Sequence, residues 1–587
     1  MKTLSNLGLR LLCSLLFVTG ALTALAGFTL HSPETTQFYV TLFPGLHRSA
    51  VSLQPYALPM MIGGTIVGVL ALALGLLLQS GSMEARRTVH GSARFAGWWE
   101  IWRAGYAAGH RQNRFTLGTH GLQTVALTDW RQREHVLGIA PPGQGKTSGI
   151  IIPNLCQERG ERGLLANDPK GELYATCAGA LSRHLSVLAF APLRPDISIH
   201  YNPLAHVRTT EDAEDLAAAW IENTGLASQT FWNDTARLLV QAMILHLRAE
   251  EPGAPFGRLA DLLGSSSFDQ VRQILKNSRS KDARALGATF VANASGDPKL
   301  VAWIMTGMAT RFMVLRNPTV RELMAPDQDP HRNLSFIELI NRPQALFLLI
   351  PAQHVDRLKP ISACLIMQLM NHLTRSQVTR PFAFYLDELC NAGRIPHYER
   401  HISLVRAQGM ALFQMIQDFG QLRRVYGPNE ARTILACSNT KIFFPGVGKE
   451  EAEYASELLG ETTVKTSSIQ RGRAGISERV SYASRRLMTA DEVRRLRRRE
   501  LLVVASNVAP MRLRSRPYFR TRRLRKLITL QPLSVNPHAQ ATSASRPNGQ
   551  AAAAQSSSQA AGFRHRAQQV LQIVHRRRPG GPGQVKP

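Results

Sequence analysis

Acidic residues are scarce in this chain, and after Glu500 there are none. Its 587 residues carry 70 Lys and Arg against 41 Asp and Glu, which gives a formal net charge of +29. Residues 501–587 alone carry fifteen Lys and Arg, about half of that excess. A surplus of this size predicts a polyanionic partner, either nucleic acid or an anionic membrane surface.

Cysteine is sparse too, and its spacing excludes the usual cysteine-based sites. The six cysteines form no C-x-x-C pair and lie near no histidine cluster, so neither a zinc site nor a disulfide framework is favoured. A hydrophobic content of 44% with 19% charged residues excludes a disordered chain. The length suits two or three domains. We expect buried, reduced side chains at Cys13, Cys156, Cys177, Cys364, Cys390 and Cys437.

Charge is absent from two long apolar runs near the start of the chain. Residues 11–30 and 57–78 carry no charged side chain, and each is long enough to span a bilayer. Basic residues precede the first run and follow the second, so both ends should face the cytoplasm. The sequence therefore predicts a two-helix anchor over residues 1–85 in a bacterial inner membrane, with a short external loop.

Two other interpretations of these apolar runs exist. Ala24-Leu25-Ala26 offers a small-residue cleavage pattern, so the first run could be a signal peptide. The second run would then still hold the chain. A pair of buried core helices is disfavoured, because core helices are rarely so free of polar residues.

Beyond residue 85, short apolar runs alternate with helical patterns. Continuous apolar runs without alternation are typical of strands covered on both faces. With helices predicted at 357–376, 398–408 and 449–459, this order indicates an α/β fold with a doubly wound, mostly parallel sheet, built from residues 86–205 and 336–528. The predicted strands are 135–140, 163–167, 186–190, 345–350, 382–386, 411–416, 441–444 and 501–505.

Two segments depart from this alternation. Residues 206–335 lack strand-like runs and contain the helical run Asp234–Glu250, which predicts an inserted all-α domain. Residues 529–587 are rich in Ala, Ser, Gln, Pro and Gly, a composition that cannot fold alone. Within this tail, Arg564–Arg578 is either a basic amphipathic helix or a solvated disordered segment.

The stretch IAPPGQGKTSG, residues 139–149, has the features of a phosphate-binding loop. It follows an apolar strand and precedes a helical run. Lys146 would neutralise β- and γ-phosphate oxygens, and Thr147 would bind Mg²⁺ through its hydroxyl. The loop pattern asks for glycine where the chain has Ala140, and a Gly/Pro turn is the alternative. The predicted contacts with ATP are Ala140, Pro141, Pro142, Gly143, Gln144, Gly145, Lys146, Thr147 and Ser148.

Acidic residues follow a second apolar strand. Asp387 and Glu388 come directly after the run 382–386, where ligands bind in open α/β sheets. We expect Asp387 to hold a water on Mg²⁺ and Glu388 to orient the attacking water. Gln417 follows another strand and would contact the γ-phosphate or that water. Alone, each of these residues could equally be a polar residue where a solvated loop begins.

Together, these motifs resemble the type IV coupling proteins, the TraG/TraD-like ATPases of conjugation and type IV secretion. The resemblance covers roughly residues 85–520. It rests on HGSAR (90–94), APPGQGKTSGIIIPNL (140–155), DPKGELY (168–174), YNPL (201–204), FWND (231–234), FYLDELCNAGRIP (384–396) and the IQD…QL…YG run (416–427).

The resemblance implies a RecA-like P-loop NTPase domain with an all-α insertion, assembled as a hexamer at the membrane. Family members recruit a relaxase–DNA complex, or protein effectors, to the secretion channel and use ATP hydrolysis with Mg²⁺ to drive transfer. Many members lack the first loop glycine, as here. By position, Arg406 matches the arginine finger that acts across the subunit interface, with four further arginines close by. Asp168 and Lys170 match a family motif or form a tight turn.

The reading favoured by the sequence is a membrane-anchored hexameric ATPase that couples DNA to a type IV secretion channel. A coupling protein dedicated to effector proteins stays open. An FtsK-type DNA pump should end in a winged-helix module, which the tail does not resemble. An L-S-G-G-Q-like stretch is absent, which disfavours an ABC subunit, and a non-hydrolysing docking platform would not need Lys146 and Glu388. The basic runs Arg494–Arg499 and Arg512–Lys526 could contact DNA or lipids, or be solvated.

Overall fold

The computed structural model describes residues 15–26, 28, 31, 54–87, 90–107, 115–224, 230–375, 380–472 and 475–529. The predicted tail helix Arg564–Arg578 lies outside these residues, as do Cys13 and the ends of the first predicted span. The chain divides into two compact units. The first joins Met1–Glu161 to Leu373–Ile528, and the second begins at Arg162 and runs to His372. The domain boundaries expected at 205 and 335 stay predictions.

Parallel strands form the centre of the first unit. Strands β9 (Thr440–Phe443), β3 (Val136–Ile139), β8 (Met410–Ile416) and β7 (Phe382–Leu386) lie side by side in that order. Every residue of these four strands is buried, as their continuous apolar sequences predict. Gly138 leaves room for Met415 on the neighbouring strand, because a Cβ there would overlap Met415 Sδ and force this side chain to shift.

An antiparallel extension continues the first unit's sheet beyond β9. Strands β12 (Glu500–Val504), β13 (Met511–Arg514), β1 (Phe115–His120) and β2 (Gln123–Leu127) follow one another there. Of these, only β12 is among the predicted strands. Strand β13 alternates buried and exposed residues, so a search for continuous apolar runs does not find it.

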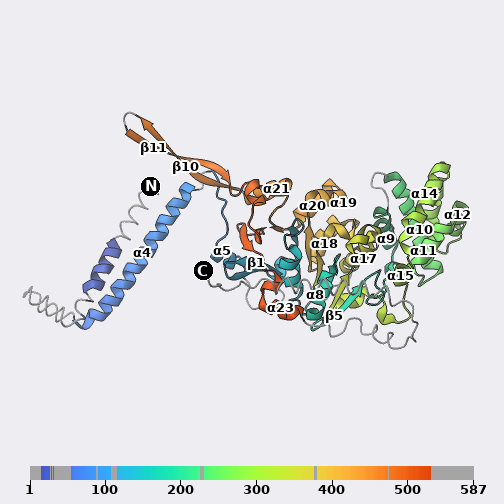
Figure 1. Cartoon of the computed structure of the whole chain (residues 1–587), viewed down its shortest axis with the longest axis horizontal. Helices are drawn as coiled ribbons and strands as arrows, with labels where there is room; N and C mark the ends of the chain where they lie inside the picture. Colours follow the sequence, from blue (N-terminus) through green and yellow to red (C-terminus); the bar gives the residue numbers. More distant parts are fainter. Residues whose placement is uncertain are drawn as a thin grey trace, which may run out of the picture. The chain divides into compact units, whose positions relative to one another are not determined.

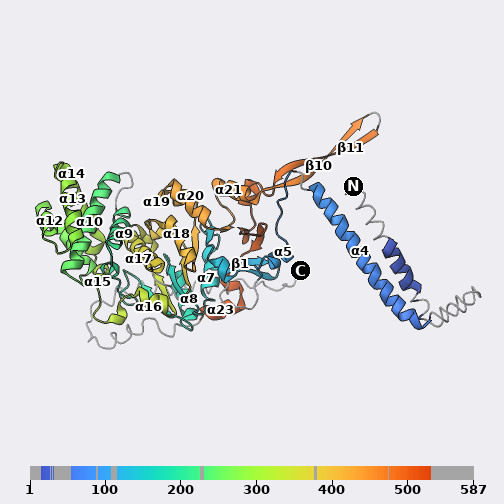
Figure 2. The same cartoon turned by 180° about the vertical axis from the view of Figure 1, so that it is seen from behind.

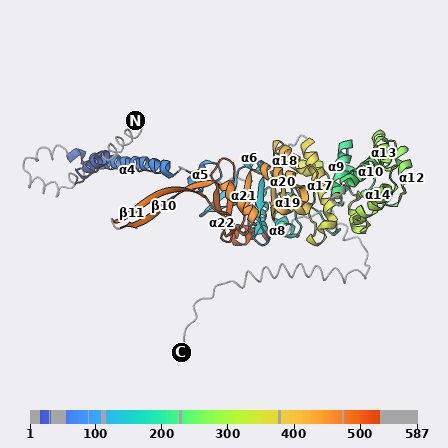
Figure 3. The ribbon, with the colours of Figure 1, turned by 90° about the horizontal axis from the view of Figure 1, so that it is seen from above.

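A long hairpin, β10 (Glu461–Gly472) with β11 (Gly475–Arg486), leaves this sheet as a separate ribbon after helix α21 (Lys449–Leu459) (Figure 3). Helices α18, α19 and α20 lie together in both Figure 1 and Figure 2. The remaining first-unit elements are η2 (Gln54–Tyr56), α4 (Ala57–Arg87), α5 (Trp98–Arg103), α6 (Asp129–Gln132), η3 (Thr147–Ile151), α7 (Ile152–Leu155), η8 (Leu389–Ala392), α18 (Tyr398–Ala407), α19 (Phe419–Tyr426), α20 (Pro428–Cys437), α22 (Ala490–Arg494), η9 (Tyr518–Arg520) and α23 (Arg522–Ile528).

The second unit holds three parallel strands in the order β4 (Gly163–Asn167), β6 (Gln344–Leu348) and β5 (Ser186–Phe190). With them, all eight predicted strands are confirmed. Helices α8 (Glu172–Leu181), α16 (Phe336–Asn341) and most of α17 (Val355–Arg375) belong to this unit, with the short turns η4 (Pro203–His206) and η7 (Ala352–His354).

Between β5 and α16 in the second unit, the elements of the described residues are all helical. Figure 1 shows α10, α11, α12 and α14 gathered as one group. The elements there are α9 (Thr210–Glu222), α10 (Thr230–Glu250), α11 (Phe256–Ser265), α12 (Phe268–Lys276), α13 (Lys281–Ala294), α14 (Pro298–Arg311), η5 (Met313–Arg316), α15 (Pro318–Leu323) and η6 (Pro330–Arg332).

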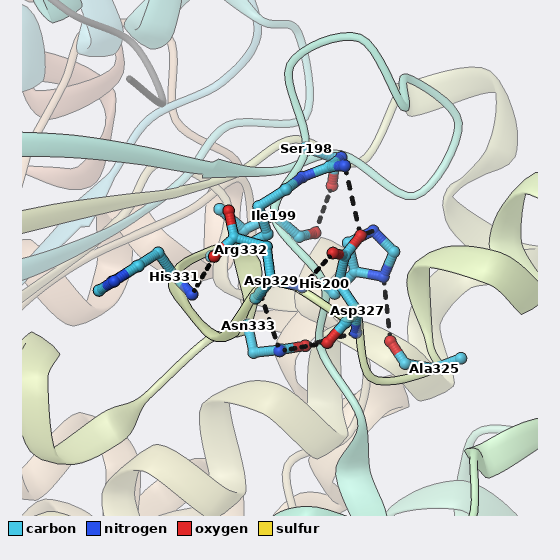
Figure 4. Close-up of polar contacts among 9 residues, drawn as sticks. All are labelled: Ser198, Ile199, His200, Ala325, Asp327, Asp329, His331, Arg332 and Asn333. Carbon is cyan, nitrogen blue, oxygen red and sulfur yellow. Dashed lines mark hydrogen bonds and ion pairs between the residues drawn. The ribbon is translucent and has the colours of Figure 1, made fainter. Parts of the chain in front are cut away.

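A polar cluster joins the two segments that lead into and out of these helices (Figure 4). His200, on the segment that leads into the helices, lies 3.0 Å through Nδ1 from the Ala325 carbonyl oxygen and 3.1 Å through Nε2 from Asp327 Oδ2, both on the segment that leads out. Its backbone N–H donates to the carbonyl of Arg332. The two ends of the helical insertion are therefore held side by side.

Helix α4 covers the second predicted membrane span. Within the part of the chain that the structure describes, none of the helices combines the length and apolar character needed to cross a bilayer. Among the cysteines in this part, Cys156, Cys177, Cys364 and Cys390 are buried and form no disulfide, as expected. Cys437 is partly exposed, with Sγ 3.6 Å from Ser403 Oγ, so its predicted burial is wrong. It ends helix α20, which exposes one side of it to solvent.

Two buried histidines make the first unit sensitive to acid. Burial lowers the pKa of His135 to about 4, with nearby Arg406 acting in the same direction. Its Nδ1 accepts from the Leu412 amide, so Nε2 carries the proton and donates to the Ile402 carbonyl. Burial, with His397 and Arg400 nearby, lowers the pKa of His401 to about 4. Both folded-state pKa values lie below the usual value of about 6.5.

Stability should therefore be complete above about pH 6.5 and fall as the pH drops towards 4, because the unfolded chain binds these protons first. Each histidine contributes about 3 kcal/mol to this loss. Thermal unfolding followed between pH 7.5 and 4.5 measures it. His135→Asn should flatten the dependence, since Asn tolerates the φ of +60° at this position. The exposed His331→Asn should leave it unchanged, and an unchanged slope in His135→Asn would contradict the assignment.

Candidate nucleotide-binding site

Three parallel strands bring the predicted site residues to one edge of the first unit's sheet. Ile139, the last residue of β3, pairs with Ile416, the last residue of β8. Leu386 ends β7 and pairs with Gln414, two residues before the end of β8. Because carboxyl ends of parallel strands share an edge, the segments that follow them meet there. These are the loop 140–146, the pair 387–388, and Gln417.

The loop backbone has the shape that the glycines were expected to supply. Gly143 and Gly145 have φ of +78° and +80°, the left-handed region that favours glycine. A Cβ at Gly143 would meet no atom within 4 Å, so space is open beside the backbone. Ala140 is not among the positive-φ residues, and its buried amide donates to the Ile416 carbonyl at 3.0 Å. Alanine therefore costs the loop no strain.

Lys146 holds a buried positive charge that lacks hydrogen bonds. Its Nζ lies 3.7 Å from Glu388 Oε2, and only 10% of the side chain is exposed. Among the described residues, Nζ finds no hydrogen-bond acceptor. A buried ammonium with three unused donors is costly, and phosphate oxygens would satisfy it. This orphaned group fits a nucleotide.

Thr147 and Asp387 form the second contact between loop and strand. The threonine hydroxyl lies 2.9 Å from both carboxylate oxygens of Asp387, and both residues are buried. A hydroxyl and a carboxylate are the oxygen ligands that Mg²⁺ takes beside phosphates. The donor set therefore fits a magnesium ion, directly or through water.

Glu388 and Gln417 complete the edge. Gln417 donates through Nε2 to Glu388 Oε1, while the other Glu388 oxygen faces Lys146. The glutamate is thereby fixed between an amide and an ammonium, and 8% of its side chain is exposed. A carboxylate held this way can orient a water at the mouth of the site.

Supporting residues come from segments that the sequence did not single out. The Gly446 amide donates to the Arg494 carbonyl at 3.2 Å, and a Cβ at Gly446 would lie 3.6 Å from Gln144 Nε2. Glu451 accepts from the Phe419 amide at 2.8 Å, which fixes the start of α19 just after Gln417. A glutamate in the first turn of a helix is common, so the sequence alone does not indicate that Glu451 fixes the start of α19.

The structure does not bring Arg406 to the loop of its own chain. Arg406 lies in the last turn of α18, half exposed, with a terminal nitrogen 3.6 Å from Glu134 Oε1. Glu134 precedes β3, so this pair lies at the opposite edge of the sheet. A finger that acts on a neighbouring subunit is compatible with this placement.

The other nearby arginines differ in their contacts. Arg394 donates to the Tyr426 carbonyl at 2.6 Å, and Arg423 pairs with Glu450. Both therefore have structural roles within the chain, whereas Arg400 and Arg424 are exposed.

Asp168, in the second unit, forms a tight turn. Its carboxylate accepts from the Tyr174 amide at 2.8 Å, and its carbonyl accepts from the amide of Gly171, which has φ of +69°. These contacts support the turn interpretation, and Lys170 beside it is exposed.

Most of the chain matches the model of a known protein family. Residues 91–558 match the family described as type IV secretory system, conjugative DNA transfer. Protein VirD4 of Agrobacterium fabrum is 25% identical over an alignment of 468 residues. The alignment covers 75% of this chain and 68% of VirD4. Conjugal transfer protein TraG of Escherichia coli is 26% identical over 490 residues, 73% of this chain and 74% of TraG.

Solved structures show the same fold. The conjugative coupling protein TrwBdeltaN70, in its unbound form, has a TM-score of 0.58 at 15% identity and covers 73% of this chain and 93% of its own. TrwB in complex with ADP and Mg²⁺ has a TM-score of 0.56 at 17% identity, covering 73% of this chain and 94% of its own.

Removing the Lys146 ammonium should abolish nucleotide binding. Lys146→Ala deletes the charge that phosphate oxygens would neutralise. Nucleotide at 100 times its Kd should stabilise the unsubstituted chain by about 2.7 kcal/mol. Thermal unfolding with and without ADP and Mg²⁺ measures this stabilisation, which Lys146→Ala should lack. Lys449→Ala removes an exposed lysine from α21 and should retain it. A full stabilisation in Lys146→Ala would contradict the loop assignment.

Proposed function

The chain belongs to the family of type IV secretory system conjugative DNA transfer proteins, and on that premise we propose that it is a membrane-anchored ATPase that couples DNA to a secretion channel. It works as a homohexamer, recruits a relaxase with its DNA, and drives transfer by hydrolysing ATP. The observation that carries the proposal is the buried Lys146 ammonium beside the Thr147–Asp387 and Glu388–Gln417 pairs.

Each of these side chains has a separate task in hydrolysis. Lys146 takes up phosphate charge and releases Glu388 from its ion pair. Thr147 and Asp387, already 2.9 Å apart, would hold Mg²⁺. Bound there, Mg²⁺ would supply charge compensation and polarisation of the phosphate oxygens. Glu388 orients the attacking water, and Gln417 keeps its carboxylate in place.

The membrane anchor consists of residues 1–85. The uncharged runs 11–30 and 57–78 support this proposal. Apolar side chains on the two N-terminal helical segments are also exposed: Leu15 is 61% exposed, Ile66 53% and Leu70 63%. Such side chains are stable when they contact lipid or a partner surface. The bulk of the chain then works at the cytoplasmic face.

DNA is the favoured substrate over protein effectors. The family match is to conjugative DNA transfer, and the net charge of +29 suits phosphate contacts. TraG of Escherichia coli bears the same function in its name, conjugal transfer.

Glu388→Gln should separate binding from hydrolysis. The amide keeps the size of the side chain but cannot orient and polarise water as a carboxylate does, so turnover should fall about 100-fold or more. ATP should still bind, because Lys146 and Thr147 are intact. Phosphate release and thermal shift with ATP measure the two effects. Glu453→Gln, an exposed glutamate on α21, is the matched control, and normal turnover in Glu388→Gln would remove it from this role.

Arg406 should act on the neighbouring subunit. Arg406→Ala alone should lose hydrolysis, and so should Lys146→Ala. A mixture of the two should recover part of it, because some interfaces then join an intact Lys146 to an intact Arg406. Replacing the Lys146→Ala partner by the Lys146→Ala/Arg406→Ala double variant removes every such interface and should abolish recovery. Equal activity in the two mixtures would exclude action in trans by Arg406.

A further inference from the structure

Strand β13 and the two residues that follow it carry arginines on one face. Arg512, Arg514 and Arg516 are exposed, whereas the alternating residues Met511, Leu513, Ser515 and Pro517 are buried. Alternate residues of a strand lie about 6.7 Å apart. The chain therefore presents a regular row of guanidinium groups.

A second segment brings more positive charge to this row. The Ser515 amide donates to the Arg499 carbonyl at 2.7 Å, and Arg514 pairs with Glu500 in the strand register. Burial, then Arg520, Arg514 and Arg498 in that order, lower the pKa of Arg499. We name Arg498, Arg499, Arg514, Arg516 and Arg520 the arginine patch.

Among the described residues, the members of the arginine patch form no ion pair, unlike the neighbouring Arg512 and Arg495. Arg512 pairs with Glu500 at 2.6 Å, and Arg495 pairs with Asp491 at 2.6 Å. Within the described part of the chain, no member of the patch forms an ion pair or a side-chain hydrogen bond. The acid beside the patch, Glu500, pairs with Arg512. Like charges gathered without ion pairs repel one another, so a polyanion would relieve this surface.

Arg499 also adopts an unfavourable backbone conformation. Its φ is +69°, a region where a residue with a Cβ is disfavoured by about 1–2 kcal/mol and glycine is not. The chain has an arginine at a position where glycine would fit better. Local strain of this kind gathers at functional sites.

The arginine patch lies at the same edge of the sheet as the nucleotide loop. The start of β12 pairs with the end of β9, and β9 ends beside β3, which leads into the loop. A Cβ on Gly149, in the helix that follows the loop, would lie 3.2 Å from Ser515 Cβ. Ser515, between Arg514 and Arg516, therefore packs against η3, which directly follows the loop.

An exposed aromatic side chain completes the surface. Phe519, between Arg516 and Arg520, is 42% exposed. Arginines that follow a phosphate backbone, with an aromatic ring for base stacking, are the usual composition of single-strand binding surfaces. Duplex DNA would use the arginines but leave the phenylalanine without a role.

We propose that the arginine patch and Phe519 bind single-stranded nucleic acid without reading its sequence, beside the nucleotide loop. This rests on the proposed function for the presence of DNA and adds the surface that holds it. Because Ser515 packs against Gly149, the bound nucleic acid would lie close to η3, the element that follows the nucleotide loop.

Binding of a labelled 30-nucleotide single strand to the full chain in detergent, measured by fluorescence anisotropy from 50 to 200 mM salt, tests the site. The patch variant Arg499→Gly/Arg514→Ala/Arg516→Ala should lower the slope of log K against log salt by about 2, since each contact with a single strand contributes about 0.7. The control Arg272→Ala/Arg342→Ala/Arg423→Ala removes equal charge from arginines paired with Asp269, Glu338 and Glu450. It should keep the slope.

Two further variants separate binding from folding and single strands from duplexes. Arg499→Gly alone should unfold no earlier than the unsubstituted chain, because strain is relieved, yet bind DNA more weakly. Phe519→Ala should weaken binding to the single strand about 5- to 150-fold, with duplex binding much less affected.

Three results would contradict the proposal, and each would point to a different cause. A patch variant with the slope and affinity of its control would refute this site and leave the DNA substrate standing. No salt-sensitive DNA binding by the unsubstituted chain would refute the DNA substrate as well. A patch variant that keeps DNA affinity in zwitterionic nanodiscs, but loses contact with anionic ones, would show a lipid site instead.

Discussion

The buried ammonium of Lys146 is the constraint on which the site depends. It lies in a fold that gives it one carboxylate at 3.7 Å and no hydrogen-bond acceptor within the described residues. Such an arrangement costs stability unless a ligand completes it. Glu388 is fixed opposite this ammonium, because Gln417 donates a hydrogen bond to its other carboxylate oxygen. The edge of the sheet is thus prepared for phosphate, and the fold must be rigid enough to keep it so.

Rigidity comes from the parallel strands behind the site. β3 is buried along its whole length between β8 and β9, and Gly138 lets Met415 pack directly against its backbone. Small shifts of such a close-packed strand are resisted, so the loop that follows β3 has a fixed origin. The same sheet carries the antiparallel strands β12 and β13, whose ends reach the nucleotide edge.

Charge is distributed over this framework in two ways. Many surface arginines, such as Arg423 and Arg495, are paired with carboxylates on nearby helices. The arginine patch is unpaired and lies beside the helix that follows the nucleotide loop. Part of the positive excess is therefore gathered where a polyanion and a nucleotide can influence each other.

The sequence by itself determined the eight apolar strands, the loop at 140–148 and the acidic pair at 387–388, because fully buried strands and phosphate loops leave local signals. It could not find β13, β1, β2 or the β10–β11 hairpin, whose half-exposed or polar residues carry no such run. Only the tertiary structure decided that Lys146 faces Glu388, that Arg406 lies at the far edge, and that Arg499 meets Arg514. These pairs are far apart along the chain, and strand register alone sets which side chains meet.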